Sequence, residues 1–453
     1  MLFRQFCLFF KLKRSYVTDL YMKNLVSFLS RHHTFSTFLI ATTLTSLSFC
    51  TNREAVPRFI QRCVEQPAVA QLDSQTAAPC FAPTAPKGTT VPKNAEGQMS
   101  GQHEVIGFLS RADSYGCPGG TVDRIETHGS LIFLCGERVY KLKREIAYAS
   151  LDFLTLEKRE RACHAELRLN RRTAPGLYLR VSAITRDRAG VLAFDADGEV
   201  LDWVVVMRRF PQSALFDRMA MAGELTPSLM QTLGVEIARF HAGAERTPAF
   251  GGSAGIRRSI ETNHQELRRQ CALLDGNAVQ ALYRDQLALL DQLSTELDRR
   301  RRDGCVRRCH GDMRLANICL FEGRPTLFDG IEFSDEIACI DVLHDLAFVL
   351  MDLQHHQLAD LAPAVLRAYL DESGEAERCA PLPLFLSVRA ATRSFTLAGS
   401  AQRQATAEAA QAKAEQARAL LRQSRLYLLD HQALGLGYPQ LASARPRPSR
   451  SHP

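Results

Sequence analysis

The sequence predicts an α+β protein of two lobes, a small lobe with an antiparallel β-sheet and a larger, mainly helical lobe. Two observations support this prediction. Short apolar runs separated by turn residues fill residues 121–210, which is typical of antiparallel strands. Apolar residues at helical spacing then dominate residues 226–430, interrupted by one hairpin-like stretch. The 453 residues are enough for two or three domains of ordinary size.

The composition is that of a globular protein, with 46% hydrophobic and 23% charged residues. The net charge of +7 is dispersed, and the run Arg299–Arg302 is typical of a solvated helix end, so no nucleic-acid partner is expected. The 13 cysteines contain no C-x-x-C pair, and Cys305 and Cys309 lack further ligands at zinc spacing. Scattered thiols favour a reducing compartment, so we expect a cytoplasmic protein.

Four segments are predicted along the chain. Residues 1–98 are rich in Ser, Thr, Pro and Phe without a sustained period, and we interpret them as a non-native or disordered extension, with translation starting near Met99. A signal-anchor at Phe35–Cys50 is the alternative, although that run is short and hydroxyl-rich, so no membrane partner is expected. Residues 99–210 form the small lobe, 211–435 the large lobe, and 436–453 a disordered basic tail.

Three polar residues in the hairpin-like stretch point to phosphoryl transfer. Asp312 follows His310-Gly311, and Asn317 comes five residues later. Strand-like residues 318–321, a turn at 322–325 and a second run at 326–328 then lead to Asp329. The hairpin would bring these side chains to one end. A carboxylate that orients a hydroxyl, and an amide and carboxylate that hold Mg²⁺ on phosphates, are what phosphoryl transfer requires.

These motifs resemble those of a known family. H-G-D-x-x-x-x-N followed by F-D-G is similar to the protein-kinase catalytic loop and its metal-binding D-F-G, and the glycine matches the aminoglycoside phosphotransferase and choline kinase branch. D-x-x-x-D-L-A, from Asp341 to Ala347, continues the match. The resemblance implies a protein-kinase-like fold, ATP and Mg²⁺ as cofactors, Asp312 as the catalytic carboxylate, and Asn317 and Asp329 as metal ligands.

Two lysines in the small lobe are candidates for phosphate binding. From residue 99 onward lysine occurs at only four positions, yet Lys141 and Lys143 alternate on one predicted strand, 138–143. A compact ammonium suits phosphate oxygens. Val139-x-Lys141 resembles the kinase V-A-x-K strand, which favours Lys141. Lys143 is the alternative residue for this contact. If neither lysine has a functional role, both would be solvated strand residues.

The resemblance assigns further roles in the small lobe. A helix predicted over 156–172 would supply the lysine's partner, for which we choose Glu166, with Glu160 and Glu157 as alternatives. All three could equally be surface ion-pair residues. The strand 202–210 would run into the adenine-binding segment near Met207. G-x-G-x-x-G is absent from the turn 127–130, but Ser130 and neighbouring N–H groups could still reach phosphate oxygens.

The other predicted elements are helices. Thr226-Pro227 is an N-cap pair opening a helix that ends at His241, which we expect to cap or pack rather than to catalyse. His310 should order the catalytic loop by packing and hydrogen bonding, and Asp345 should hold that loop in place. Further strands and helices are predicted over 121–126, 131–134, 178–184, 191–194, 278–302, 346–353, 361–370 and 383–430.

The phrases YKLK, ELRLNRR, MRRFP, CHGDMRLANICL and LFDGIEF are similar to those of an uncharacterised, aminoglycoside-phosphotransferase-like branch over residues 105–430. Many relatives in that branch carry a C-terminal P-loop ATPase domain. Because no G-x-x-x-x-G-K-[ST] occurs in this sequence, we expect the kinase-like part alone.

The resulting hypothesis is a phosphotransferase that acts on a hydroxyl group of a small molecule. Glu332 is a candidate second carboxylate near the metal, and Asp352 and Glu336 are guesses at acceptor-binding acids. A nucleotide-binding pseudokinase or regulatory module is the alternative function. The acceptor and the oligomeric state are not predicted.

Overall fold

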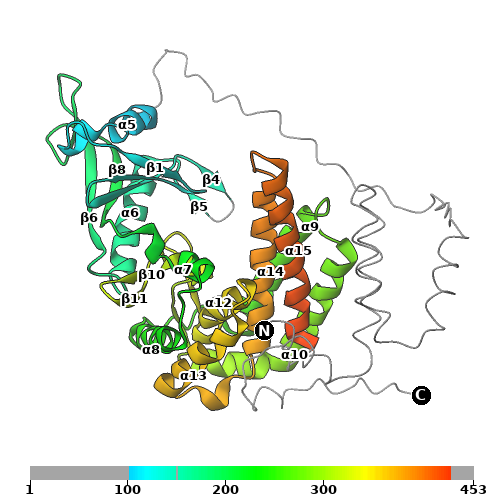
Figure 1. Cartoon of the computed structure of the whole chain (residues 1–453). Helices are drawn as coiled ribbons and strands as arrows, with labels where there is room; N and C mark the ends of the chain where they lie inside the picture. The colour runs from blue at the N-terminus through cyan, green and yellow to red at the C-terminus, as the bar shows by residue number, and fades with distance from the viewer. Residues whose placement is uncertain (1–100, 149–150, 430–453) are drawn as a thin grey trace, which may run out of the picture. The chain divides into compact units, whose positions relative to one another are not determined.

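The structure is a computed structural model, and it describes residues 101–148 and 151–429. The predicted extension 1–98 and tail 436–453 lie outside the described residues, so both stay predictions. Figure 1 shows the described elements. In the small lobe they are α5 (Gly101–Leu109), β1 (Asp123–Glu126), β2 (Ser130–Cys135), β3 (Arg138–Lys143), β4 (Ala147–Tyr148), β5 (Leu151–Asp152), α6 (Leu156–Asn170), β6 (Tyr178–Arg186), β7 (Leu192–Phe194) and β8 (Glu199–Arg208).

The small lobe is an antiparallel sheet in the order β1-β2-β3-β8-β6-β7 with a helix on each face. Val204 and Val206 of β8 pack with α5 residues, whereas Val205 and Met207 pack with Cys163 of α6. The uninterrupted apolar run of β8 therefore reflects burial on both faces. Because side chains alternate along a strand, the two lysines of β3 share the α6 face.

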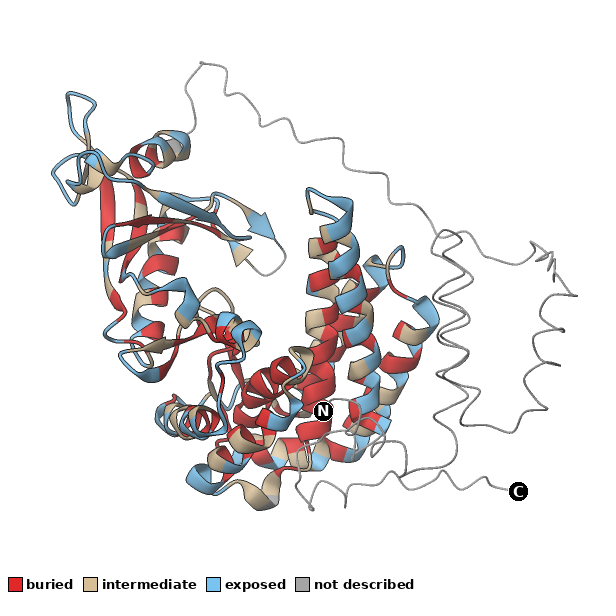
Figure 2. Cartoon of the chain, in the orientation of Figure 1, coloured by how far each residue is buried: buried red, intermediate tan, exposed pale blue. Residues whose placement is uncertain are grey.

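The large lobe is mainly helical and surrounds one buried helix. Its elements are α7 (Phe216–Ala222), α8 (Pro227–Gly243), α9 (Gly252–Arg269), α10 (Gly276–Arg302), β9 (Val306–Arg308), β10 (Ile318–Phe321), β11 (Arg324–Leu327), α11 (Asp335–Ala338), β12 (Cys339–Asp341), α12 (Val342–His355), α13 (Ala362–Ser373), α14 (Leu382–Ala401) and α15 (Ala407–Leu429). Residues 342–353 of α12 are all buried, and Figure 2 shows burial concentrated in α12 and α14. A helix that is buried on every side lies in the core, and its two aspartates, Asp345 and Asp352, accept hydrogen bonds there.

The structure corrects the predicted hairpin turn and divides the predicted helical region 383–430. The hairpin turn is Glu322-Gly323 alone, with φ of 50° and 78°, and Arg324 and Pro325 belong to strand β11. Two consecutive positive φ values match the twist of a tight hairpin, so the strands extend closer to the turn than proline suggested. The region 383–430 is helical as predicted and consists of two helices, α14 and α15, which are separated by residues 402–406 and pack on each other.

Candidate active site

The predicted catalytic loop, residues 310–317, contains a glycine that no other residue can replace without strain. Gly311 has φ of 85°, and a Cβ added there would lie 2.9 Å from the Ile331 side chain. The backbone N–H groups of His310 and Gly311 each donate to the Asp345 carboxylate, at 2.9 Å. The structure therefore places Asp345 where it fixes the loop, as the sequence indicated.

Two buried histidines connect this loop to neighbouring segments by hydrogen bonds. His241 Nε2 lies 3.1 Å from Asp345 Oδ2, and its Nδ1 lies 3.1 Å from the Tyr369 hydroxyl. His310 Nε2 lies 2.9 Å from the Phe328 carbonyl oxygen, which joins the loop to the end of the hairpin. Both histidines are about 2% exposed. Their contacts are those of packing and loop-ordering residues.

Asp312 is held by two neighbours of its own loop. Asn317 Nδ2 donates to Asp312 Oδ2 at 2.9 Å, which leaves the Asn317 amide oxygen for a cation. Arg314 donates from Nε and Nη2 to both carboxylate oxygens, at 2.7 and 2.9 Å. Burial would raise the pKa of the Asp312 carboxyl, but the Arg314 guanidinium outweighs burial and holds that pKa well below its usual range. Asp312 is therefore a carboxylate at every physiological pH.

Asp329 adopts a conformation that is costly for a residue with a side chain. Its φ is 61°, in the left-handed region. The Asp329 N–H donates to the Tyr178 hydroxyl at 3.1 Å, and the Gly330 N–H donates to Asn170 Oδ1 at 2.8 Å. The Asp329 side chain is 43% exposed and lies 2.5 Å from Lys141 Nζ. Small-lobe residues thus hold the backbone while the carboxylate stays accessible.

Lys141 is buried and paired with Glu166. Lys141 is 8% exposed, and its Nζ lies 2.8 Å from Glu166 Oε1. The alternative of two solvated strand lysines is therefore wrong. Glu157 is exposed at the start of α6, so Glu166 is the glutamate of this helix that meets the lysine. Whether Lys141 contacts phosphate stays a prediction.

Glu166 also contacts the second lysine. Its Oε2 accepts from Lys143, which is 2% exposed and also pairs with Glu332. Burial would raise the pKa of Glu166, but the two ammonium groups outweigh burial and lower it from 4.5 to about 2. Because this pKa is lowered, ionised Glu166 stabilises the fold above pH 4.5, and that contribution is lost as the pH falls toward 2.

A cavity of about 280 Å³ lies between the β-sheet and the hairpin. The cavity brings together Lys141, Met207, Asn317 and Asp329 from the sequence prediction. It does not include Ser130, which is 4% exposed and whose N–H bonds to Thr127 Oγ1. The remaining lining residues, mostly apolar, are Ile125, Thr127, Ile132, Leu134, Val139, Tyr178, Arg208, Phe210, Gln212, Leu215, Ala316 and Phe328.

The proposed acceptor acids have different environments. Asp352 is buried, and its Oδ2 accepts from the Leu315 N–H at 2.9 Å, so it anchors the catalytic loop. Glu336 is exposed. The sequence did not reveal the roles of Arg314, Tyr178 and Asn170. The last two act through tertiary contacts, which no local pattern reveals.

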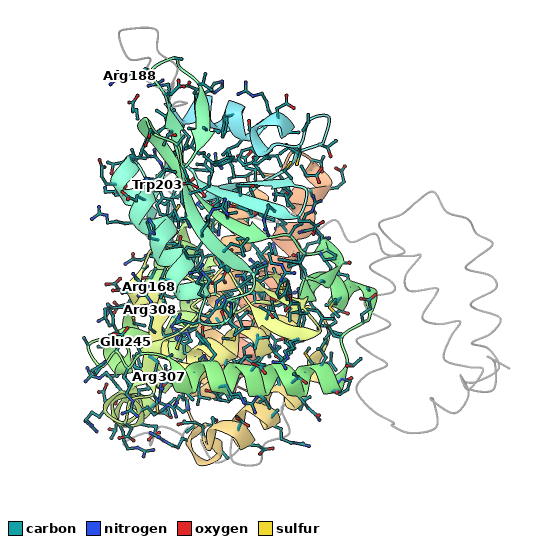
Figure 3. The ribbon with its side chains drawn as sticks, turned by 90° about the vertical axis from the view of Figure 1, so that its left-hand side faces the viewer. Arg168, Arg188, Trp203, Glu245, Arg307 and Arg308 are labelled. Atoms are coloured by element: carbon teal, nitrogen blue, oxygen red, sulfur yellow. The ribbon has the colours of Figure 1, made fainter. Side chains whose placement is uncertain are left out.

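Arg172 joins the lobes beside the loop, and two further hydrogen bonds hold β9 within the large lobe. Arg172, just beyond α6, donates from Nη1 to the Arg308 carbonyl oxygen at 2.6 Å, and the Arg308 N–H donates to the Glu245 carbonyl at 2.8 Å. Arg307 donates to the carbonyl of His241 at 2.9 Å. Figure 3 shows Arg168 of α6 above Arg308, Glu245 and Arg307 on this face. These contacts fix the strand that leads into His310.

A family model for the phosphotransferase enzyme family matches residues 153–382. The chain belongs to this family. The match begins directly after β5 and runs through residues 310–317 and α13 to the first residue of α14. Family membership and the observed sheet lobe and helical lobe together confirm the predicted kinase-like fold.

The chain is similar to an uncharacterised protein of Mycobacterium tuberculosis and to one of Mycobacterium bovis. Each is 29% identical over 277 residues, which is 60% of this chain and 54% of the relative. The chain therefore spans about half the length of these curated relatives.

Among solved structures, the chain is similar to a choline/ethanolamine kinase family protein from Mesorhizobium loti, with 13% identity and a TM-score of 0.42 over 75% of this chain and 99% of that chain. It is also similar to choline kinase from Cryptosporidium parvum, with 11% identity and a TM-score of 0.45 over 76% and 99%.

Within residues 101–148 and 151–429, every helix is too short or too polar to span a bilayer.

Proposed function

We propose that this chain transfers the γ-phosphoryl group of MgATP to a hydroxyl group of a small molecule. The observation that carries the proposal is the convergence of Lys141, Asn317 and Asp329 on one cavity, with Asn317 bonded to Asp312. These residues come from strand β3, the catalytic loop and the end of the hairpin. Structural stability alone does not require an accessible aspartate in a strained conformation beside a buried lysine.

The cavity has the chemistry that a magnesium nucleotide needs. Aliphatic and aromatic side chains such as Val139, Met207 and Phe328 would sandwich a purine ring, and polar groups line the same cavity. Lys141 would bind phosphate oxygens. The amide oxygen of Asn317 and the carboxylate of Asp329 are hard oxygen ligands of the kind that Mg²⁺ prefers. When bound, the cation neutralises charge on the phosphates.

Asp312 would orient the acceptor hydroxyl and receive its proton as the oxygen–phosphorus bond forms and ADP departs. Its lowered pKa makes it a weak base, which suits orientation more than early proton removal. A loose transition state leaves little charge on the attacking oxygen until late, so a weak base is sufficient. The acceptor hydroxyl would then compete with Arg314 for the Asp312 oxygens.

A second function, nucleotide binding without turnover, is favoured by one observation. Arg314 and Asn317 together donate three hydrogen bonds to the two oxygens of Asp312, so a substrate hydroxyl must compete with them for this carboxylate. A regulatory module would retain such a pairing.

ADP formation measured with a panel of hydroxyl-bearing metabolites separates the two functions. A phosphotransferase is expected to form ADP only with Mg²⁺, and faster with at least one compound of the panel, with phosphate recovered on that compound. Saturable MgADP binding together with no ADP formation above that of Asp312→Asn would instead establish a nucleotide-binding module.

A further inference from the structure

Five charged side chains of alternating sign form a ladder across three elements, and all of them except Asp329 are largely buried. The lysines come from β3, Glu166 comes from α6, and the two outer carboxylates come from the segment after β11. In order of contact the ladder consists of Asp329, Lys141, Glu166, Lys143 and Glu332. Its three carboxylates and two ammonium groups carry a net charge of −1 when all are ionised.

The centre of the ladder is a carboxylate that water does not reach. The Glu166 side chain is 0% exposed, and each of its oxygens contacts one lysine. An ionised carboxylate in such a place is strongly disfavoured unless cations and hydrogen bonds compensate it. Both lysines therefore contribute to keeping Glu166 charged and in one orientation.

The two lysines have different access to the nucleotide cavity. Lys141 lines the cavity and reaches the accessible Asp329, whereas Lys143 lies outside the lining residues. Lys143 is enclosed by Glu166, by Glu332 and by the Phe153 ring, whose centroid is 5.3 Å from Nζ. The Glu332 side chain is only 6% exposed, and burial together with nearby Glu166 raises its pKa. Lys143 thus pairs with two buried carboxylates and does not line the nucleotide cavity.

We propose that Lys143 and Glu332 are positioning residues that set how strongly Glu166 holds Lys141, and hence how readily Lys141 binds nucleotide phosphates. This inference rests on the proposed function. When a nucleotide binds, Lys141 leaves Asp329 and pairs with phosphate, while Asp329 binds the cation. Lys143 does not exchange its partners, so it remains the constant counter-charge of Glu166 while Lys141 moves toward the phosphates.

This arrangement gives the two residues effects of opposite sign. Without Lys143, Glu166 would hold Lys141 more strongly, and the ladder's net charge would become −2, which repels phosphates. Without the charge of Glu332, Lys143 would compensate Glu166 more completely, and the net charge would become zero. If the contacts served folding alone, both substitutions would act in the same direction or have no effect on affinity.

Calorimetric titration of the full chain with MgADP tests this directly. Lys143→Met is expected to weaken MgADP binding by about tenfold or more, and the isosteric Glu332→Gln to leave it equal or tighten it severalfold. Lys158→Met is the matched control. Lys158 is a small-lobe lysine whose pair with Asp152 is exposed, so its loss should leave affinity unchanged. Thermal unfolding identifies variants that do not fold.

The outcomes separate this inference from the proposed function. Wild-type affinity in Lys143→Met, or clearly weaker binding in Glu332→Gln, would overturn the inference while the proposed function stands. If Lys143→Met does not fold, the sign of the Glu332→Gln effect decides alone. If the wild-type chain binds no MgADP, both proposals are overturned.

Discussion

Replacing Asp312 with asparagine is expected to lower the rate of MgATP turnover by about 10²- to 10⁴-fold, the range for losing a positioned general base. Asparagine keeps the size of the side chain and an oxygen for Arg314, so the loop should keep its shape. Asp312 does not line the nucleotide cavity, and MgADP affinity should therefore change by less than about threefold. Steady-state kinetics and calorimetry on the same preparation measure the two quantities.

Asp360→Asn is a suitable control, because Asp360 is an exposed carboxylate of the large lobe outside the site. Wild-type turnover is expected in this variant. Asp312→Ala should lose as much activity as Asp312→Asn, because both lack the carboxylate. Turnover retained in either Asp312 variant would remove this residue from the base role.

Replacing Arg300 with methionine is expected to lower the free energy of unfolding by about 3–5 kcal/mol, because it leaves buried carboxylates unpaired. Arg300 of α10 is 0% exposed and donates to both oxygens of Asp341, each at 2.8 Å, and to Glu375 at 2.5 Å. Asp341 in turn caps α12 by accepting from the Leu343 N–H at 2.9 Å. The variant therefore weakens the helix that carries Asp345.

The neighbouring Arg299 offers a matched control for this effect. Its side chain is 49% exposed and pairs with Glu296 on the same helix, so Arg299→Met should cost less than about 1 kcal/mol. Chemical denaturation of both variants gives the comparison. Equal losses in the two variants would contradict the assignment of Arg300 and Asp341 as a buried anchor of α12.

The sequence was most informative where the relevant residues are close together in the chain. Asp312, Asn317 and Asp329 lie within one loop and hairpin, so strand length and turn position alone brought them together. The alternation of Lys141 and Lys143 on β3 likewise follows from local geometry. Helix α9 had a readable signal that was missed, because Ile256, Ile260 and Leu267 recur at helical spacing and are buried.

Other features depend on contacts between distant segments, which spacing does not encode. Glu332 meets Lys143 across 189 positions, and Tyr178 meets Asp329 across 151. Arg314 is adjacent to Asp312 in sequence, but arginine is common on this chain's surface, and nothing local distinguishes it from a solvated residue. Ser130 was placed near phosphate by its turn, yet strand pairing opposite Lys143 buries it.

The central claim is that a carboxylate and an amide from the hairpin region and a lysine from the sheet form one magnesium-nucleotide site. Calorimetric titration with ADP, with and without Mg²⁺, on the wild-type chain and on Asp329→Asn tests it most directly. We predict that Mg²⁺ strengthens ADP binding to the wild type by about tenfold or more and that Asp329→Asn loses this enhancement. Equal Mg²⁺ enhancement in both proteins, or no saturable ADP binding to the wild type, would contradict the claim.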